Sequence, residues 1–440
     1  MMRRALRLVA LVLALAIALA LVGSLLLRVH AARRLEQAQN RFQTEVGSLD
    51  IAAYVPDPVA EAENGARWFV AGAQALILSD ADWDLVNRRI RTLGEPWPPQ
   101  DQEAIVALLE AQSGALELLQ RAGELDSGDF GIDYERWFEA ELPNFVELLQ
   151  AGRVLAVRCD WEEQSGDLEA ATATLRTLER LAATQLHEPP VIGLLAGSAV
   201  ERIYLDRLES LLQRIDDPAE LQRLRADLDH LSDAALDPRV PFSADIAVTS
   251  AWIRERGPFT EATFVANFDP EADAVLRGLL RRAGYADLVA AVQLEAAMAM
   301  LARWEDPLAE AHEAAFLPDG RRRSWVPGAD RLAAFVTPNF SDAMRRAQAT
   351  RSARALARTA LDLRQTGLEA GAYPPRLEDP PVSEYSGETA TYRVGDDGAE
   401  IAFPAAERAW EDLMGPHAVP RRGLMFPVTL RLRWRLPPLG

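Results

Sequence analysis

The first 34 residues show the most uneven distribution of apolar and charged positions in the chain. Residues 5–27 form a run of 23 positions in which Arg7 is the only charged side chain. Arginines flank this run on both sides: Arg3, Arg4, Arg28, Arg33 and Arg34. Crossing the hydrocarbon core of a bilayer takes about 20 apolar residues, whereas the apolar centre of a cleaved secretory signal has roughly 7 to 15. The pattern therefore predicts an uncleaved anchor over residues 1–34, in contact with the membrane through residues 5–27. A cleaved signal is the alternative, because Val29-His30-Ala31 is an acceptable cleavage site.

Membrane orientation follows less directly. Counting Arg7 with Arg3 and Arg4, three arginines lie near each end of the apolar run, so the positive-inside rule is nearly balanced. A short N-terminal tail before a single apolar helix is typical of proteins whose following domain is translocated. We therefore expect a single pass through the inner membrane of a bacterium, with the bulk of the chain periplasmic or otherwise extracytoplasmic. A cytoplasmic domain tethered by its N-terminus is the alternative.

From residue 32 to 366 the apolar positions recur at helical spacing almost throughout. One example begins after Pro98-Pro99 and places five apolar side chains on one face of a single helix: Ile105, Leu108, Leu109, Leu116 and Leu119. Breaks at Gly166-Asp167, Pro189-Pro190 and Asp216-Asp217-Pro218 separate later helical stretches. Short breaks of this kind predict antiparallel helical hairpins.

After residue 370 the spacing changes from helical to alternating. Residues 392–394 and 401–403 lie on either side of Asp397-Gly398, a dipeptide favoured in β-hairpin turns. Residues 428–436 alternate strictly between apolar and polar side chains, which indicates a strand with one buried face. The expected fold class is therefore mainly α: an N-terminal transmembrane helix, a body of antiparallel helical hairpins and a small antiparallel β module at the C-terminus.

These changes in pattern divide the chain into four parts. After the anchor we expect a helical lobe over residues 35–235. Proline, phenylalanine and tryptophan are frequent in residues 236–272, which indicates an irregular joint at the start of a second helical lobe. That lobe is expected over 236–366 and ends in a long Arg-rich helix. The β-containing module is expected over 367–440.

Charge and cysteine content limit the partners and the sources of stability. The chain has 66 acidic and 47 basic residues, and its first 34 residues hold six arginines and no acid. The remainder is therefore strongly acidic and would be repelled by phosphate backbones, so no nucleic-acid partner is expected. The single cysteine, Cys159, excludes an intramolecular disulfide, and stability must come from packing.

No sequence motif predicts a catalytic, cofactor or metal site. His312-Glu313 begins a zinc-protease pattern, but Phe316 occupies the position of the required second histidine. The acidic loop over residues 126–135 lacks the ligand spacing of an EF-hand. The chain has no lysine for a P-loop and no Gly-x-Ser-x-Gly turn. Catalysis by paired carboxylates stays open, because the sequence does not show how far apart its acidic side chains lie.

The one cationic feature outside the anchor is a helix expected over residues 340–365. At 100° per residue, Arg351, Arg354 and Arg358 cluster on the side opposite an apolar seam. In an acidic chain these arginines are expected to pair with carboxylates of neighbouring lobes. The alternative is a docking strip for an acidic protein partner, with these three arginines as the binding residues.

Residues 355–403 resemble part of a known family. A helix, a G-x-YP-x-x-L turn, an SG element and a short hairpin follow one another at residues 355–363, 371–377, 385–387 and 392–398. This order is similar to the C-terminal globular end of type II secretion pseudopilins. The prepilin-peptidase site of that family is missing near Gly23-Ser24-Leu25, and its calcium-binding stretch is altered at residues 379–383, so no bound metal is implied. The whole chain resembles membrane-anchored envelope proteins of bacteria, which implies a location and an architecture but no reaction.

Together these features predict a non-enzymatic, single-pass protein of the bacterial cell envelope whose exterior helical domain binds or scaffolds partners. No cofactor is expected. Two alternatives stay open: an envelope hydrolase that uses carboxylates, and an accessory component of a secretion or pilus-like machine.

The anchor interpretation predicts the behaviour of a truncated chain. Deleting residues 1–31 should leave a soluble, folded, helix-rich protein, because the apolar run is the only part that needs a bilayer. Fractionation and circular dichroism measure this outcome. If the N-terminus of the full-length product is instead found near Ala31 or Ala32, the segment is a cleaved signal and the anchor prediction is wrong.

Overall fold

The computed structural model describes residues 2–134, 136, 140–256, 284–302, 323–324, 329–336, 340–414 and 432–439. It confirms a mainly helical fold with a long apolar N-terminal helix and a small antiparallel sheet near the C-terminus. The chain forms two compact units, and each contains separate parts of the sequence. Unit 1 comprises Met1–Ala53 and Phe242–Ser341, and unit 2 comprises Tyr54–Pro241 and Asp342–Gly440. The expected ranges 35–235 and 236–366 therefore each contribute to both units.

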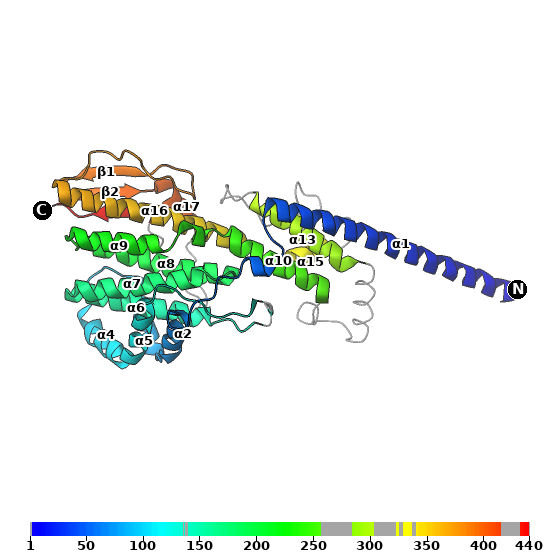
Figure 1. The fold of residues 1–440 in the computed structure, drawn as a ribbon, viewed down its shortest axis with the longest axis horizontal. Coiled ribbons are helices and arrows are strands. Elements are labelled where there is room, and N and C mark those ends of the chain that lie inside the picture. Colours follow the sequence, from blue (N-terminus) through cyan, green and yellow to red (C-terminus); the bar gives the residue numbers. More distant parts are fainter. Residues whose placement is uncertain are drawn as a thin grey trace. The chain divides into compact units, whose positions relative to one another are not determined.

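Unit 1 is built around the N-terminal helix α1 (Met2–Glu45) and α13 (Tyr285–Leu301) (Figure 1). The helix α15 (Ala329–Val336) packs against α13, and most of α10 (Arg239–Arg256) also belongs to this unit. Among the described residues, α1 is the one helix that is long and apolar enough to cross a membrane.

The side chains of α1 change from exposed to buried without a break in the helix. Apolar side chains between Leu11 and Val29 are exposed in every direction, for example Leu11 at 67%. Beyond them, Ala31, Leu35, Ala38 and Phe42 are buried at alternating spacings of four and three residues, which places them on one helical face. This face packs against α13. One continuous helix therefore joins the apolar segment to the core of unit 1.

Unit 2 is mainly helical. Its N-terminal helices are α2 (Ala66–Ala75), α3 (Asp80–Ile90), α4 (Pro99–Ala111) and α5 (Ser113–Gly123). They are followed by α6 (Phe145–Ser165), α7 (Leu168–Leu186), α8 (Val191–Leu212) and α9 (Pro218–His230). The C-terminal helices are α16 (Phe340–Ala370), nearly all of which lies in this unit, and α17 (Pro404–Met414). A short 3-10 turn, η3 (Asp233–Leu236), follows α9, and another, η1 (Ile51–Ala53), ends the first segment of unit 1.

Helix boundaries in unit 2 mostly follow the sequence signals. Asp167 and Asp217 cap the N-termini of α7 and α9 by accepting hydrogen bonds from backbone N–H groups. Gly166 ends α6 with φ of 88°, a backbone conformation that glycine adopts readily. The single helix expected through Leu119 is wrong, because the chain breaks at Gln112 into α4 and α5. The Gln112 side chain instead bonds both the N–H and the carbonyl of Ile77, at 3.0 and 2.9 Å.

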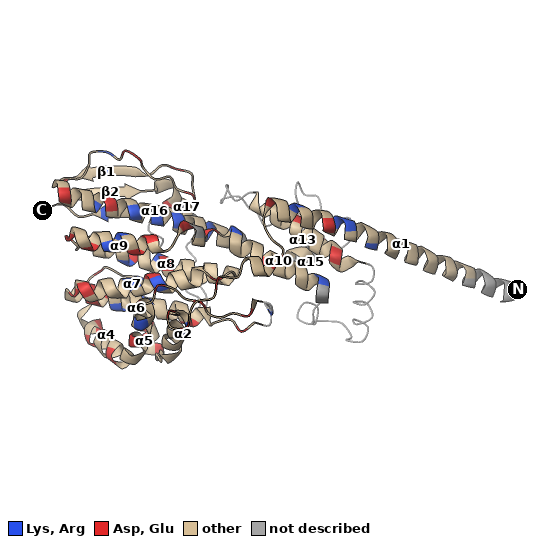
Figure 2. Ribbon diagram, viewed as in Figure 1, with Lys and Arg blue, Asp and Glu red and all other residues tan. Residues whose placement is uncertain are grey.

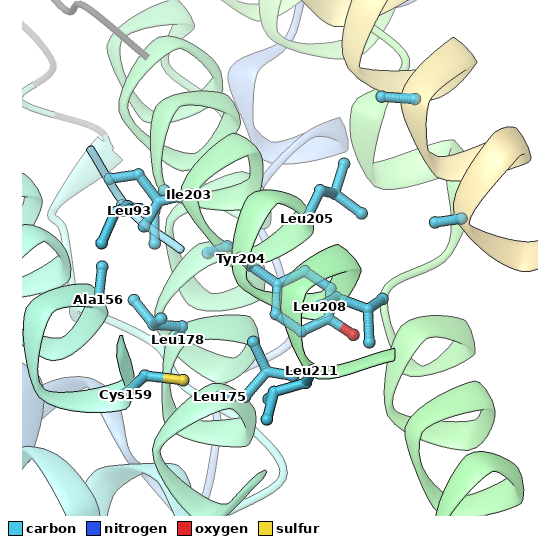
Figure 3. Packing of buried hydrophobic residues seen from close by; sticks show 14 of the residues in the cluster. Leu93, Ala156, Cys159, Leu175, Leu178, Ile203, Tyr204, Leu205, Leu208 and Leu211 are labelled. Atoms are coloured by element: carbon cyan, nitrogen blue, oxygen red, sulfur yellow. The ribbon is translucent and has the colours of Figure 1, made fainter. Parts of the chain in front are cut away.

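The core of unit 2 lies where α6, α7 and α8 pack together (Figure 3). Leu175 and Leu178 of α7 meet Cys159 of α6 and a row of α8 side chains that includes Tyr204 and Leu208. A close approach between α7 and α8 depends on glycine, since a Cβ at Gly197 would lie 2.5 Å from the Leu186 Cγ. These contacts make α7 and α8 the central helices of the unit.

A three-stranded antiparallel sheet, in the order β1 (Thr391–Gly395), β2 (Gly398–Ala402) and β3 (Arg433–Leu436), completes unit 2. The hairpin turn is Asp396-Asp397, so the predicted hairpin is confirmed. The register places Tyr392, Ile401 and Trp434 in one cross-strand row that faces the core. Of the strand expected over 428–436, the structure describes residues 432–436, of which 433–436 form β3, and residues 428–431 lie outside the described part. His312, Glu313 and Phe316 lie outside it as well.

Two substitutions in α8, one at a buried and one at an exposed position, should show how much core packing contributes to the stability of unit 2. Leu208→Ala is expected to lower the free energy of unfolding of unit 2 by about 2–5 kcal/mol, because it removes a fully buried side chain and leaves a cavity. Ile192→Ala, on an exposed position of the same helix, is the matched control and should change stability by less than about 0.5 kcal/mol. Urea denaturation of the full-length protein in detergent, followed by circular dichroism, measures both. Equal effects would contradict the packing described here.

Candidate functional site

The charged groups that sequence reasoning singled out lie on α16, whose apolar seam is buried as expected. Ala349, Ala353 and Leu356 are among the buried residues of that seam, and the arginines project from the other side of the helix. Figure 2 marks basic residues along α16 and acidic residues along α9. The structure gives each of the three arginines an acidic partner within unit 2.

Arg354 is the most deeply buried of the three, with no exposed side-chain surface. Its Nη1 forms an ion pair with Oε1 of Glu201 on α8, whose side chain is equally buried. Its Nη2 donates to the carbonyl oxygens of Leu228 and Leu231 at the end of α9, the latter at 2.6 Å. One guanidinium therefore joins α16, α8 and the C-terminus of α9.

Arg351 and Arg358 form more peripheral pairs. Arg358 donates through two nitrogens to both carboxylate oxygens of Asp233, at 2.8 and 2.7 Å, and through Nε to Asp229 at 3.0 Å. Arg351 lies 2.9 Å from a carboxylate oxygen of Glu384. Both arginine side chains are 20% exposed. The three ion pairs match the pairing interpretation; docking of an acidic partner at these arginines stays a prediction.

Two further buried groups, Glu179 on α7 and Tyr204 on α8, belong to the same cluster as Glu201 and Arg354. Burial raises the pKa of Glu179 to about 8, and the neighbouring charge of Arg180, 2.9 Å away, only partly opposes this. Burial also raises the pKa of Tyr204 well above its usual range. In the described part of the chain, Oε1 of Glu179, Oε2 of Glu201 and the Tyr204 hydroxyl find no hydrogen-bond partner. Glu179 is therefore mainly protonated at neutral pH.

A second buried cluster connects α3, α6 and α8 around Arg207. Its Nη1 lies 2.7 Å from Oδ1 of Asp160 and 3.4 Å from Oε2 of Glu163. The other oxygen of Asp160 accepts a 2.6 Å hydrogen bond from Arg89, whose guanidinium stacks over the ring of Trp97 at 4.2 Å. Sequence reasoning missed this cluster. Its signal was present, since Asp160 and Glu163 continue the buried face of α6 that includes Ala156.

The acidic loop that begins at Asp126 is bonded to α7 and to its own backbone. Asp126 pairs with Arg180 at 2.9 Å, and Asp129 accepts a 2.7 Å hydrogen bond from the backbone of Gly131. Glu188, at the end of α7, accepts bonds from the Phe130 backbone and the Tyr134 hydroxyl, while burial raises its pKa to about 7. Within the described residues no group of three or more His, Cys, Asp and Glu side chains is arranged to hold a metal ion.

Carboxylates with raised pKa values are candidates for acid–base catalysis, but a substrate must be able to reach them. Glu179 and Glu201 have no exposed surface, and their neighbours are side chains of α7, α8, α9 and α16. A substrate would reach either carboxylate only if these helices separated. The geometry is that of a polar core that fixes how the helices pack.

Comparison with known proteins finds no matching family model, no matching curated protein and no matching solved structure.

The depth of Arg354 predicts unequal effects for substitutions along α16. Arg354→Gln should lower the free energy of unfolding by about 3–5 kcal/mol, because it leaves Glu201 buried without its cation. Arg351→Gln, which removes a partly exposed pair on the same helix, should cost about 0–1 kcal/mol. Urea denaturation compares the two variants. Comparable losses would show that Arg354 does not hold the three helices together.

The raised pKa of Glu179 predicts a pH dependence of stability. Because the folded-state pKa lies above that of the unfolded chain, folding favours the protonated acid, and the stabilisation is lost as pH rises through about 8. Glu179→Gln should therefore reduce the fall in unfolding free energy between about pH 5 and pH 8. Glu169→Gln, at an exposed position of the same helix, is the control and should retain the full fall. An unchanged pH profile in Glu179→Gln would contradict the assignment.

Proposed function

We propose that this chain is a single-pass membrane protein of the bacterial cell envelope and that its helical domain, outside the cytoplasm, binds or scaffolds partners. The observation that carries the proposal is α1, in which a largely exposed apolar half continues directly into a half that packs against α13. A bilayer is the solvent that this exposed half requires.

Large apolar side chains of α1 are left uncovered by the described part of unit 1. Ten of them between Leu11 and Leu26 are 52–67% exposed. Burying apolar surface stabilises by roughly 25 cal/mol per Å², so a membrane would stabilise this segment strongly. The same residues in water would form an exposed apolar patch much larger than monomeric proteins carry.

The binding role draws support from where the charged groups lie. The most buried carboxylates and arginines of unit 2 join one helix to another, and this leaves the surface of the domain for interaction with partners. An accessory role in a secretion or pilus-like machine is one form of this proposal. The succession of α16, a turn segment and the β1–β2 hairpin, in the order found at the end of pseudopilins, supports that form.

The proposal has two parts that can be tested in the same cells. Full-length protein should stay with the membrane after an alkaline wash, and alkaline phosphatase fused to the C-terminus should be active, because this enzyme matures outside the cytoplasm. Chemical crosslinking of intact cells should then give discrete adducts of the domain with other proteins. A protein released by the wash would refute the anchor. An inactive alkaline phosphatase fusion, together with a fluorescent fusion of green fluorescent protein at the same position, would refute the orientation. The absence of adducts would refute the scaffold role.

A further inference from the structure

Unit 1 begins to pack against α1 immediately after the apolar run ends. Gly284, which precedes α13, has φ of +76°, and a Cβ built on it would lie 2.9 Å from the Cα of Arg28. Arg28 directly follows Leu27, the last residue of the run. Glycine at position 284 therefore allows the start of α13 to touch α1 at the level where the helix would leave the hydrocarbon core.

The two helices then continue in the same direction. Arg34, six residues beyond Arg28 on α1, forms a bidentate pair with Glu295 of α13 at 2.8 and 2.7 Å. Glu295 in turn lies further along α13 from Gly284, so both helices lead away from the end of the apolar run. The first turn of α13 is consequently the part of that helix nearest to the bilayer.

Within the described residues, the arginines of α1 beyond the apolar run form two groups, those that pair with a carboxylate and those that do not. Arg34 pairs with Glu295 and Arg41 pairs with Glu45. Arg28 and Arg33 are exposed, and no carboxylate in the described part of the chain pairs with them. At about 1.5 Å per residue they lie roughly 2 and 9 Å beyond Leu27, and the headgroup layer occupies about 5–7 Å on each side of the core. Arginine side chains near a helix end extend toward this layer.

We infer that the first turn of α13, together with Arg28 and Arg33, rests in the lipid headgroup layer, and that these two arginines bind phosphates of anionic lipids. In the described residues, packing of unit 1 against α1 thus begins directly where the apolar run ends, at Gly284 and Arg28. The inference depends on the proposed anchor, and it adds a surface of the domain that the anchor alone does not require.

The level of α13 can be measured by fluorescence quenching. Asp287→Cys places a label in the first turn of α13, and Ala302→Cys places one about 23 Å further along the helix at 1.5 Å per residue. The native Cys159 is buried, and burial raises the pKa of its thiol, so only the introduced cysteine reacts. In vesicles that contain headgroup-labelled nitroxide lipid, the label at 287 should be quenched several-fold more than the label at 302.

The lipid contact has its own test. Full-length protein purified in mild detergent from membranes of phosphatidylglycerol and phosphatidylethanolamine should retain an excess of phosphatidylglycerol over the starting mixture. The double variant Arg28→Gln, Arg33→Gln should lose this excess, whereas Arg41→Gln should keep it.

The possible outcomes test the membrane anchor and the membrane contact of α13 separately. A full-length protein that never enters the vesicles would refute both. A protein that inserts but shows equal quenching at 287 and 302 would overturn the membrane contact of α13 and leave the anchor intact. Retention of the lipid excess by the double variant would overturn the role of the two arginines.

Discussion

The packing of unit 2 depends on arginine–carboxylate pairs buried between its helices. Moving each ion out of water costs several kcal/mol, and a good pair with additional hydrogen bonds offsets this cost only when every partner is in place. Arg354 reaches three elements and Arg207 reaches carboxylates on α6 from α8. If one of these helices shifted along its neighbour, a buried charge would lose its partner. These pairs therefore favour one relative placement of α6, α8, α9 and α16.

The carboxylates around these arginines are not equivalent. Asp160 accepts hydrogen bonds from two guanidinium groups and from the backbone N–H of Gly94, which fixes the position of its carboxylate group. Glu179 shares Arg180 with Asp126, and burial raises its pKa. Asp160 therefore has several donors, whereas Glu179 shares its one guanidinium with a second acid and gains or loses a proton at about pH 8. Titration of Glu179 therefore makes the stability of unit 2 depend on pH.

Continuity of α1 has a mechanical consequence for unit 1. A flexible linker would let a domain move independently of its anchor, but α1 passes from its apolar half into the α13 contact as one helix. The apolar half of α1 is thus rigidly connected to α13 through Arg34 and Glu295 and through the buried face that ends at Phe42.

Features that depend on neighbours along the chain were readable from the sequence: the apolar run, the helical spacing, the helix breaks at Gly166 and Pro218, and the β1–β2 hairpin. Each follows from side-chain periodicity or turn chemistry within a few residues. The apolar seam of α16 and its arginine side were predicted on the same basis. The break at Gln112 was not, because it depends on hydrogen bonds to Ile77, 35 residues away.

Only the tertiary structure decided which acids the arginines meet. Arg354 and Glu201 are 153 residues apart, and Arg207 and Asp160 are 47 apart, so no local pattern could pair them among 66 acidic residues. The same holds for the composition of the two units, each of which combines distant segments. Periodicity tells which face of a helix is buried, but whether a charge on that face is neutralised depends on the helix that packs against it, and that partner is set by the three-dimensional arrangement of the whole unit.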